Sequence, residues 1–421
     1  MYFDSESYDC RNESYFSRTA QLAPWAIVQP RNTDEVSRSL KALVRTPGCK
    51  FAVRSGGHMQ WAGANNIRDG ITIDLGRTWA DAYKELEKHG RMVAGGRDGA
   101  VGIGGLLTGG GKTFYTCRTG FACDQVVNYE VVLANGTVIE ANDQKNSDIF
   151  RVLKGGGNNF GIVTRFDIAT FPSKDIWDGN IIYDKEITPQ LAEVLLDFIQ
   201  NLAKNPDSHV AAAWTYLPKT ENHFINMFLT NLDGDKESRS LSKFLAIPGK
   251  REMKMSTVAT KVASSALGAG LPTGKENTWF SLTFKADSRI VLRAAEVFEA
   301  TVGNLKAQVP DYDFVLMMLL QPLPIDCLLL LFVLQVETSE LRTTIGLPAL
   351  KGAIDEIEAF AESMGGNVRF RYLNYCDGSQ DPLYSYGEKN VEMMRIAAAK
   401  YDPSRVFQTQ VPGGFKISKV K

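Results

Sequence analysis

Val53-Arg54-Ser55-Gly56-Gly57-His58 is the stretch of the chain that says most about its fold. Two adjacent glycines let the backbone turn sharply and bring its N–H groups against a bound anion, because neither position carries a Cβ atom. The histidine that follows places a nucleophilic imidazole beside this turn. The pattern is typical of a site for a phosphate-bearing cofactor that is held tightly or bonded to the protein, although Gly-Gly-His alone also occurs in ordinary surface turns.

A second glycine-rich stretch runs from Gly95 to Gly111 and has nine glycines in seventeen residues. This density costs too much backbone entropy for ordinary folded structure, so we expect the stretch to wrap a ligand. Two familiar phosphate loops do not fit it. The dinucleotide fingerprint needs a small residue where Leu107 stands, and the mononucleotide loop needs a glycine where Leu106 stands.

The composition limits the class of protein and the kind of partner. The chain has 421 residues, of which 44% are hydrophobic and 23% charged, as expected for a globular protein with two domains. A formal net charge of −1 gives no electrostatic reason to expect nucleic acid or an anionic membrane as partner. We therefore expect a small-molecule substrate.

Other classes of site and location are also limited by the sequence. The six cysteines and four histidines show no metal-ligand spacing, so no metal site is expected. The first residues lack the basic and then apolar pattern of a secretory signal, which makes the cytoplasm the default location. The apolar passage 314–336 is interrupted by Gln321, Pro322, Pro324 and Asp326, and this predicts two short buried strands rather than a membrane span.

Local patterns predict an alternation of helices and short strands. Residues 26–28 and 51–53 are expected to be strands, and between them Asn32 is expected to cap a helix. Asn135-Gly136 is a strong signal for a hairpin between 126–133 and 137–139. Further along, Thr188-Pro189 begins a helix with the apolar spacing of one that lies on a sheet.

Taken together, the motifs resemble those of flavoprotein oxidases of the vanillyl-alcohol oxidase and para-cresol methylhydroxylase (PCMH) type, and among them the berberine-bridge-enzyme-like branch. The resemblance spans nearly the whole chain and is specific as a set of motifs. In chain order, these are Arg-Ser-Gly-Gly-His at 54–58, Gly-Gly-Arg at 95–97, Val-Gly-Ile-Gly-Gly-Leu-Leu-Thr-Gly-Gly-Gly at 101–111, Gly-Phe-Ala-Cys-Asp-Gln-Val at 120–126, Lys-Gly-Gly-Gly-Asn-Asn-Phe-Gly-Ile-Val-Thr at 154–164, Tyr-Leu-Asn-Tyr at 372–375 and Pro-Gly-Gly-Phe-Lys at 412–416.

The resemblance implies an α+β, two-domain flavoprotein whose FAD-binding domain is split between the two ends of the chain. Residues 1–175 would form the PCMH-type FAD-binding domain, and residues 386–421 would return to it. Residues 176–385 would form an inserted substrate-binding domain, built on an antiparallel sheet backed by helices. Relatives are often secreted, so the family does not fix the location.

FAD is the cofactor that the resemblance implies, with a covalent bond from the ring of His58 to the 8α-methyl group of the flavin. Asp98 stands where some relatives have a cysteine that makes a second bond, and a carboxylate cannot form that thioether. A single attachment is therefore expected. The residues expected to bind the cofactor are Arg54, Ser55, Gly56, Gly57, His58, Gly96, Gly102, Gly104, Gly105, Thr108, Gly109, Gly110, Gly161, Val163 and Asn374.

The implied reaction is oxidation of a small organic substrate, such as a secondary metabolite, an alcohol or a sugar. In relatives, hydride passes to flavin N5, and O2 reoxidises the flavin and is released as H2O2. Tyr375 and Tyr372 are the expected catalytic residues, and a tyrosine acts as a base only where its surroundings lower its pKa from about 10. The alternation in 372–375 predicts a strand in which Tyr375 and Leu373 share one face.

Two alternative functions stay open at this point. A flavin dehydrogenase would pass electrons to an acceptor other than O2, and a degenerate flavin-fold scaffold would guide a cyclisation without net redox chemistry. The chain departs from the family in two places, and the one after Gly76 is the feature that favours the scaffold. A pair of strands found in relatives is missing after Gly76, and the passage 321–350 is compressed. Such losses would leave strands beside the flavin without hydrogen-bond partners.

Overall fold

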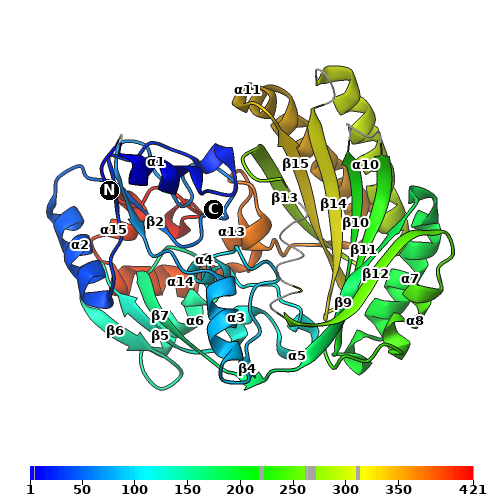
Figure 1. Ribbon diagram of the computed structural model, residues 1–421. Helices are drawn as coiled ribbons and strands as arrows, with labels where there is room; N and C mark the ends of the chain where they lie inside the picture. The colour runs from blue at the N-terminus through cyan, green and yellow to red at the C-terminus, as the bar shows by residue number, and fades with distance from the viewer. Residues whose placement is uncertain (4, 218–221, 261–262, 264–271, 310–312, 421) are drawn as a thin grey trace.

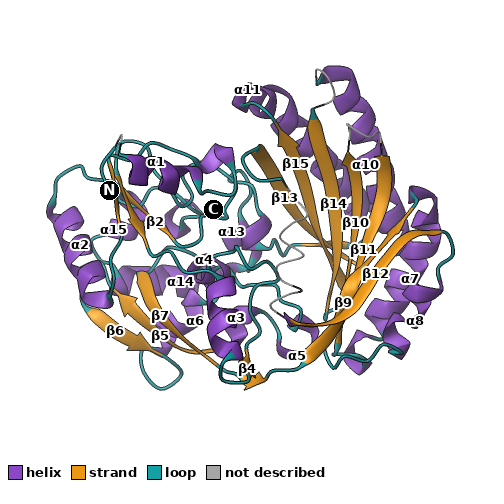
Figure 2. Cartoon of the chain, viewed as in Figure 1, coloured by secondary structure: helices purple, strands orange, loops and turns teal. Residues whose placement is uncertain are grey.

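The structure is a computed structural model that describes residues 1–3, 5–217, 222–260, 263, 272–309 and 313–420. Within these residues it shows an α+β protein with two parts (Figures 1 and 2). One part holds three small sheets and both ends of the chain, and the other holds one large antiparallel sheet. We propose that they correspond to the split FAD-binding domain, 1–175 with 386–421, and to the substrate-binding domain, 176–385. None of the helices in the described part of the chain has the length and apolar character that a membrane crossing requires.

The first small sheet is parallel and has the order β1-β3-β2. Its strands are β1 (Ala26–Val28), β2 (Phe51–Arg54) and β3 (Ile71–Asp74). Helix α2 (Thr33–Arg45) connects β1 to β2, and the side chain of Asn32 caps it by accepting a 2.9 Å hydrogen bond from the N–H of Glu35. The predicted strands and the predicted cap are confirmed.

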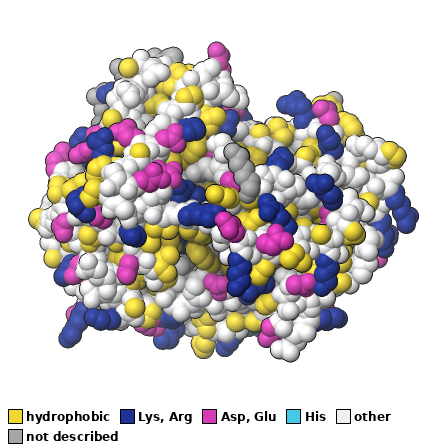
Figure 3. All heavy atoms as spheres, turned by 180° about the vertical axis from the view of Figure 1, so that it is seen from behind, with side chains coloured by type: hydrophobic (Ala, Val, Ile, Leu, Met, Phe, Trp, Pro, Cys, Tyr) yellow, Lys and Arg dark blue, Asp and Glu magenta, His cyan; other side chains and the backbone are white. Residues whose placement is uncertain are grey.

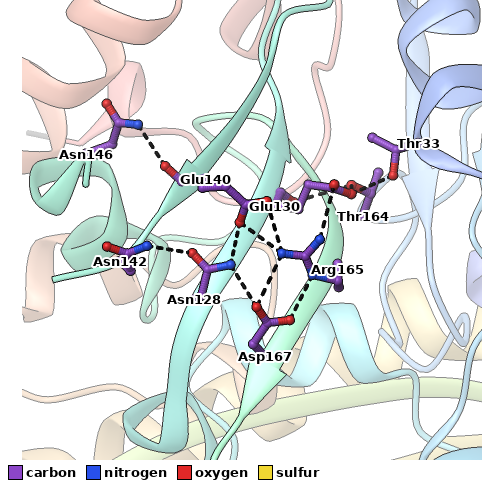
Figure 4. Close-up of polar contacts among 9 residues, drawn as sticks. All are labelled: Thr33, Asn128, Glu130, Glu140, Asn142, Asn146, Thr164, Arg165 and Asp167. Carbon is purple, nitrogen blue, oxygen red and sulfur yellow. Dashed lines mark hydrogen bonds and ion pairs between the residues drawn. The ribbon is translucent and has the colours of Figure 1, made fainter. Parts of the chain in front are cut away.

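The second small sheet is antiparallel and has the order β6-β5-β7, with β5 at Val126–Val132, β6 at Val138–Ala141 and β7 at Ile162–Ile168. The hairpin at Asn135-Gly136 is confirmed, and Gly136 has φ +79°, a conformation that glycine adopts without steric strain. On the outer face, Arg165 lies among carboxylates from all three strands (Figure 4). This network is largely exposed, so it contributes little to stability.

The remaining elements of this part connect and cover the small sheets. At the C-terminal end, the N–H of Phe51 donates to the carbonyl of Gln410 at 2.8 Å, so the end of the chain does return to the first sheet. Helix α14 ends directly before Asp402. The elements are α1 (Glu6–Glu13), α3 (Trp79–Glu87), β4 (Arg91–Met92), α4 (Ile103–Thr108), α5 (Thr116–Thr119), α6 (Ser147–Leu153), β8 (Phe171–Pro172), α13 (Pro382–Ser385), α14 (Glu388–Tyr401) and α15 (Val406–Thr409).

The large sheet has eight strands in the order β12-β9-β11-β10-β14-β15-β13-β16, and each neighbouring pair is antiparallel. The strands are β9 (Asp175–Tyr183), β10 (Ser208–Leu217), β11 (Asn222–Asn231), β12 (Lys250–Ala259), β13 (Glu276–Lys285), β14 (Phe314–Leu323), β15 (Cys327–Val336) and β16 (Asn367–Val368). The helices of this part are α7 (Thr188–Gln200), α8 (Arg239–Ala246), α10 (Ser288–Gln308), α11 (Ser339–Leu341) and α12 (Leu347–Ser363).

The two faces of the large sheet have different roles. Strand β10 shows the alternation, because Ala212, Trp214 and Tyr216 belong to the hydrophobic core shared with the helices, whereas Ala211 and Ala213 line a cavity on the other face. Helices α7 and α10 lie on the outer side of the sheet (Figure 1). The expected architecture of an antiparallel sheet backed by helices is therefore confirmed.

Two expectations for local structure need correction. The passage 314–336 does form two buried strands, but each has ten residues, and Gln321 and Pro322 lie inside β14. Proline is tolerated there because the pairing of β14 with β10 ends at Leu320, so the missing N–H removes no bond on that side. Residues 373–375 form a 3₁₀ turn rather than a strand, and so Tyr375 does not share a face with Leu373.

The strand that ends before Gly76 is fully paired. Strand β3 has β1 on one side and β2 on the other, in register along its length. Gly76 turns with φ +60°, and Thr78 then caps α3 in a capping box with Asp81. Among the described strands, β2, which leads into the Gly-Gly-His turn, is an edge strand paired only with β3, so the expected loss of partners beside the flavin stays a prediction.

We predict that Asp74 fixes the N-terminal segment to the first sheet. Its carboxylate is fully buried and accepts hydrogen bonds from Arg11 at 2.5 and 2.8 Å and from Gln29 at 2.9 Å. Asp74→Asn should lower the free energy of unfolding by about 2 to 4 kcal/mol, because it leaves the guanidinium of Arg11 without its counter-charge. Asp34→Asn, in an exposed pair with Arg38, should cost less than about 1 kcal/mol. Equal urea midpoints for the two variants would contradict this role.

Candidate functional site

A cavity of about 610 Å³ lies between the glycine-rich loops and the open face of the large sheet. One wall comes from the first half of the chain and includes Ser55, Gly56, Gly57 and His58, and the opposite wall comes from strands β9, β10, β11, β13, β14 and β15. From behind, hydrophobic side chains are seen to gather around a hollow near the middle of the molecule (Figure 3). A space of this size accepts a large ligand.

The two glycine-rich stretches lie in direct backbone contact at this cavity. A Cβ atom at Gly56 would lie 2.4 Å from the backbone N of Gly102, and a Cβ atom at Gly102 would lie 2.1 Å from the N of Gly56. Real Cβ atoms do not approach backbone so closely, so both positions require glycine. Gly57 has φ +76°, which also favours glycine.

Several backbone N–H groups at this turn are left for a ligand. Among the described residues, the N–H groups of Gly56, Gly57, His58 and Gly105 have no hydrogen-bond acceptor, and all four residues line the cavity. The N–H of Gly104 donates to Ser55 Oγ at 3.2 Å instead. Neighbouring backbone N–H donors without protein acceptors match the chemistry of a phosphate group. The pyrophosphate of a dinucleotide therefore fits this loop.

His58 lies on the cavity wall with its ring stacked on Phe16, at 4.3 Å between ring centroids, and with the edge of Trp279 at 6.3 Å. Burial lowers the pKa of His58, and the nearby charge of Asp98 opposes this shift only in part. The imidazole is therefore neutral at pH 7 and retains a nitrogen lone pair. A neutral imidazole is the form that can act as a nucleophile toward a bound cofactor.

Asp98 also lines the cavity, where its Oδ1 accepts a 2.8 Å hydrogen bond from the N–H of Ala100. Gly161, Val163, Thr108 and Asn374 lie on the cavity wall as well, together with Gly102, Gly104 and Gly105. These predicted cofactor-binding residues are thus brought together by the fold.

Four of the predicted cofactor-binding residues lie away from the cavity wall. Arg54 turns its guanidinium toward the N-terminal segment, where it donates to the carbonyl of Arg11 at 2.7 Å and lies over the ring of Tyr15. Gly96 packs against the ring of Trp79, and Gly109 and Gly110 pack against Asn374 and Tyr372. Their positions indicate that they shape the loops rather than face a ligand.

The two predicted catalytic tyrosines lie side by side on the 3₁₀ turn, with ring centroids 4.7 Å apart. The hydroxyl oxygen of Tyr372 accepts from the backbone N–H of Lys112 at 2.7 Å and from Asn374 Nδ2 at 3.1 Å. Burial raises the pKa of Tyr372 far above its ordinary value. Tyr372 therefore stays protonated and holds the glycine-rich loop in place.

Tyr375, unlike Tyr372, has its hydroxyl oxygen bound by a charged side chain at the cavity wall. Its oxygen accepts from Arg97 Nη2 at 2.8 Å and from Gln321 Nε2 at 3.3 Å. Tyr375 also lines the cavity, so its hydroxyl group is within reach of a bound ligand. A phenol oxygen held by a guanidinium at the cavity wall is placed to exchange a proton with a bound substrate.

The sequence analysis missed the cationic groups around Tyr375. The second nitrogen of the Arg97 guanidinium lies 3.3 Å from His209 Nε2, and Lys112 Nζ donates to the carbonyl of Pro322 at 3.0 Å. Because arginine can only donate, His209 Nε2 is the acceptor, and burial lowers the pKa of His209 well below its ordinary value. Arg97 ends the quoted Gly-Gly-Arg motif and Lys112 directly follows the glycine-rich stretch, but nothing in the sequence connected them to His209 or Gln321.

Comparison with known proteins agrees with the site. Residues 68–142 match the family model described as FAD binding domain. The FAD-dependent monooxygenase drtC of Aspergillus calidoustus is 36% identical over an alignment of 468 positions that covers 100% of this chain and 87% of the relative. The aligned span exceeds the length of this chain, so the relative carries additional segments.

Two solved structures share the fold. The 6-hydroxy-D-nicotine oxidase of Arthrobacter nicotinovorans aligns with a TM-score of 0.81 and 19% identity, over 97% of this chain and 95% of the other. A glucooligosaccharide oxidase of Acremonium strictum, described with a 6-S-cysteinyl, 8α-N1-histidyl FAD, aligns with a TM-score of 0.77 and 18% identity, over 96% of this chain and 94% of the other.

We predict that Gly56→Ala prevents normal loading of the cofactor. The added methyl group would force the two glycine loops apart, because the atoms that it meets belong to the backbone of residue 102. The purified variant should hold much less FAD per chain than the wild type, as measured by the ratio of visible to ultraviolet absorbance. Gly303→Ala, in open space on α10, is the control and should load normally. Normal loading of Gly56→Ala would show that the loop contact is not required.

Proposed function

Because the chain belongs to the FAD-linked oxidoreductases of the vanillyl-alcohol oxidase and berberine-bridge-enzyme-like family, we propose that it oxidises a small organic substrate with O2 as the electron acceptor. The observation that carries the proposal is Tyr375, whose oxygen is held by Arg97 and Gln321 at the wall of the cavity. A scaffold without chemistry has no need for a phenol in this environment.

FAD, when bound, takes up a hydride from the substrate and passes two electrons to O2, which leaves as H2O2 with two protons. The residues that would hold it are those with free N–H groups, Gly56, Gly57 and His58, on the pyrophosphate. The neutral ring of His58 would bond to the 8α carbon, as the name of the Acremonium enzyme states for its own histidyl FAD. One C–H bond of the 8α-methyl group would be lost as a proton, and the two electrons would pass through the flavin to O2. Asp98 offers no thiol for a second bond, so His58 is the single attachment in this proposal.

Tyr375 would take the proton from the substrate while the hydride leaves. The guanidinium of Arg97 compensates the negative charge on the phenol oxygen, and Gln321 fixes the direction of that oxygen. Neutral His209 holds Arg97 from the other side and adds no second positive charge. The ring of Trp279 contacts both Tyr375 and His58 edge-on, and so it connects the two ends of the site.

A candidate substrate should bleach the bound flavin when air is excluded. On exposure to O2 the flavin should regain its yellow colour, and one H2O2 should be released per substrate molecule oxidised. A flavin that stays bleached in air but reacts with an artificial acceptor would indicate a dehydrogenase. Because a close relative is named a monooxygenase, ¹⁸O2 should also be supplied. If ¹⁸O is found in the organic product, the enzyme inserts oxygen into the substrate and the oxidase proposal is wrong.

We predict that acid precipitation of the purified protein leaves a yellow pellet, because the flavin is bonded to His58. In His58→Ala the colour should move to the supernatant, since only noncovalent contacts would remain. A digest should give one flavin-bearing peptide, containing residue 58. A white pellet from the wild type, or flavin on a peptide with residue 98, would contradict the single histidyl link.

We predict that Tyr375→Phe slows anaerobic flavin reduction by about 10²- to 10⁴-fold, the usual contribution of a general base. Folding and flavin content should remain close to wild type, because the change removes one oxygen atom. The reaction of the reduced enzyme with O2 should be unchanged. Tyr384→Phe, on an exposed ring, serves as the control. A slowing of less than about threefold would mean that Tyr375 is a packing residue.

A further inference from the structure

Two buried cations lie beside the cavity without a carboxylate partner. Arg97 and Lys112 are 8% and 2% exposed, and both line the cavity. In the described part of the chain, neither belongs to an ion pair. Arg97 donates to the neutral groups of His209 and Tyr375, and Lys112 donates to the carbonyl of Pro322.

Both side chains have donors left over. A guanidinium has five N–H groups and an ammonium has three. Among the described residues, the contacts above use two N–H groups of Arg97 and one of Lys112. Burial and the charge of Arg97 lower the pKa of Lys112 to about 7, so the second positive charge is costly to keep without an anion nearby. A bound anion would remove that cost.

The acidic residues of the cavity do not supply this anion. Asp98 accepts from the N–H of Ala100, within its own turn. Asp178, on β9, accepts from Thr230 Oγ1 at 2.6 Å, and burial raises its pKa to about 6. Neither carboxylate is within ion-pair distance of Arg97 or Lys112, so a ligand is the remaining source of negative charge.

The wall of the large sheet is mostly apolar. Strands β11, β13, β14 and β15 contribute side chains that offer no charge to a ligand, and Ala211 and Ala213 on β10 leave room above the sheet. The apolar side chains are Phe224, Phe228, Trp279, Met317, Leu319 and Leu331. An apolar carbon skeleton would be buried favourably against such a wall.

We propose that the substrate is an apolar molecule that carries one negatively charged oxygen, from a carboxylic acid, an enol or an acidic phenol, and that Arg97 and Lys112 bind this oxygen. The inference deepens the proposed function, since it takes this cavity as the substrate site. Held there, the charged oxygen lies beside Tyr375, so the position of the substrate is fixed next to the group that exchanges its proton.

The test is a binding measurement on the oxidised, flavin-loaded protein, so that it does not depend on turnover. Matched probes are 2-naphthoate and its neutral analogue 2-naphthamide, with 4-nitrophenolate and 4-nitroanisole as a second pair that separates carboxylate from phenolate. Binding is followed by quenching of tryptophan fluorescence and by changes in the flavin spectrum. The charged member of at least one pair should bind about 10- to 100-fold more tightly, the range for hydrogen bonds to charged groups.

In Lys112→Met and Arg97→Met the charged probe should bind no more than about threefold more tightly than the neutral probe. The affinity for the neutral probe should change little, because only the contacts to the charge are lost. Lys88→Met, an exposed cation outside the cavity, should keep the wild-type preference. Flavin content and circular dichroism identify a variant that fails to fold. Lys112→Gln, which keeps hydrogen bonding without the charge, should also lose the preference.

Equal affinity for the charged and neutral probes in the wild type would overturn the inference. So would an unchanged preference in the Lys112 variants. If these variants instead lower the midpoint potential of the bound flavin and leave the preference intact, the cations serve the cofactor and the inference is wrong. A wild type that prefers the anions, while none of the substrates tried reduces its flavin, would refute the proposed oxidation and leave the binding inference standing.

Discussion

Gly56 and Gly102 lie against each other with no room for a side chain on either residue, and the rest of the site depends on this contact. It joins the turn after β2 to the turn before α4, so two segments that are distant in sequence form one wall. Gly56, Gly57 and His58 of the first turn line the cavity, and in the part of the chain that the structure describes their N–H groups have no acceptor. These donors define where the pyrophosphate fits, and His58 follows them directly in the chain.

The large sheet forms the opposite wall of the cavity, because side chains along its strands alternate between the two faces of the sheet. One face of the large sheet is buried against α7, α10 and α12, so the other is left to form the cavity. Polar side chains are concentrated where β10 and β14 meet the glycine loops, and they are the charged Arg97 and the neutral His209 and Gln321. The cavity therefore has a polar region beside Tyr375 and an apolar wall along the sheet.

The sequence predicted the parts of the fold that depend on neighbouring residues. The cap at Asn32, the hairpin at Asn135-Gly136 and the glycine turns follow from local geometry, and the resemblance to a family supplied the order of the parts. The four residues 372–375 were too few to distinguish a strand from a 3₁₀ turn. The partners of Tyr375 could not be predicted either, because Arg97, His209 and Gln321 come together only through the packing of the sheet on the loops.

A crystal structure of the purified, FAD-loaded protein tests the central claim most directly. The account predicts pyrophosphate oxygens within ordinary hydrogen-bond distance, about 2.7 to 3.2 Å, of the backbone nitrogens of Gly56, Gly57 and His58. It also predicts a flavin ring placed between His58 and Tyr375. A pyrophosphate bound elsewhere, with these N–H groups facing only water or protein acceptors, would contradict it.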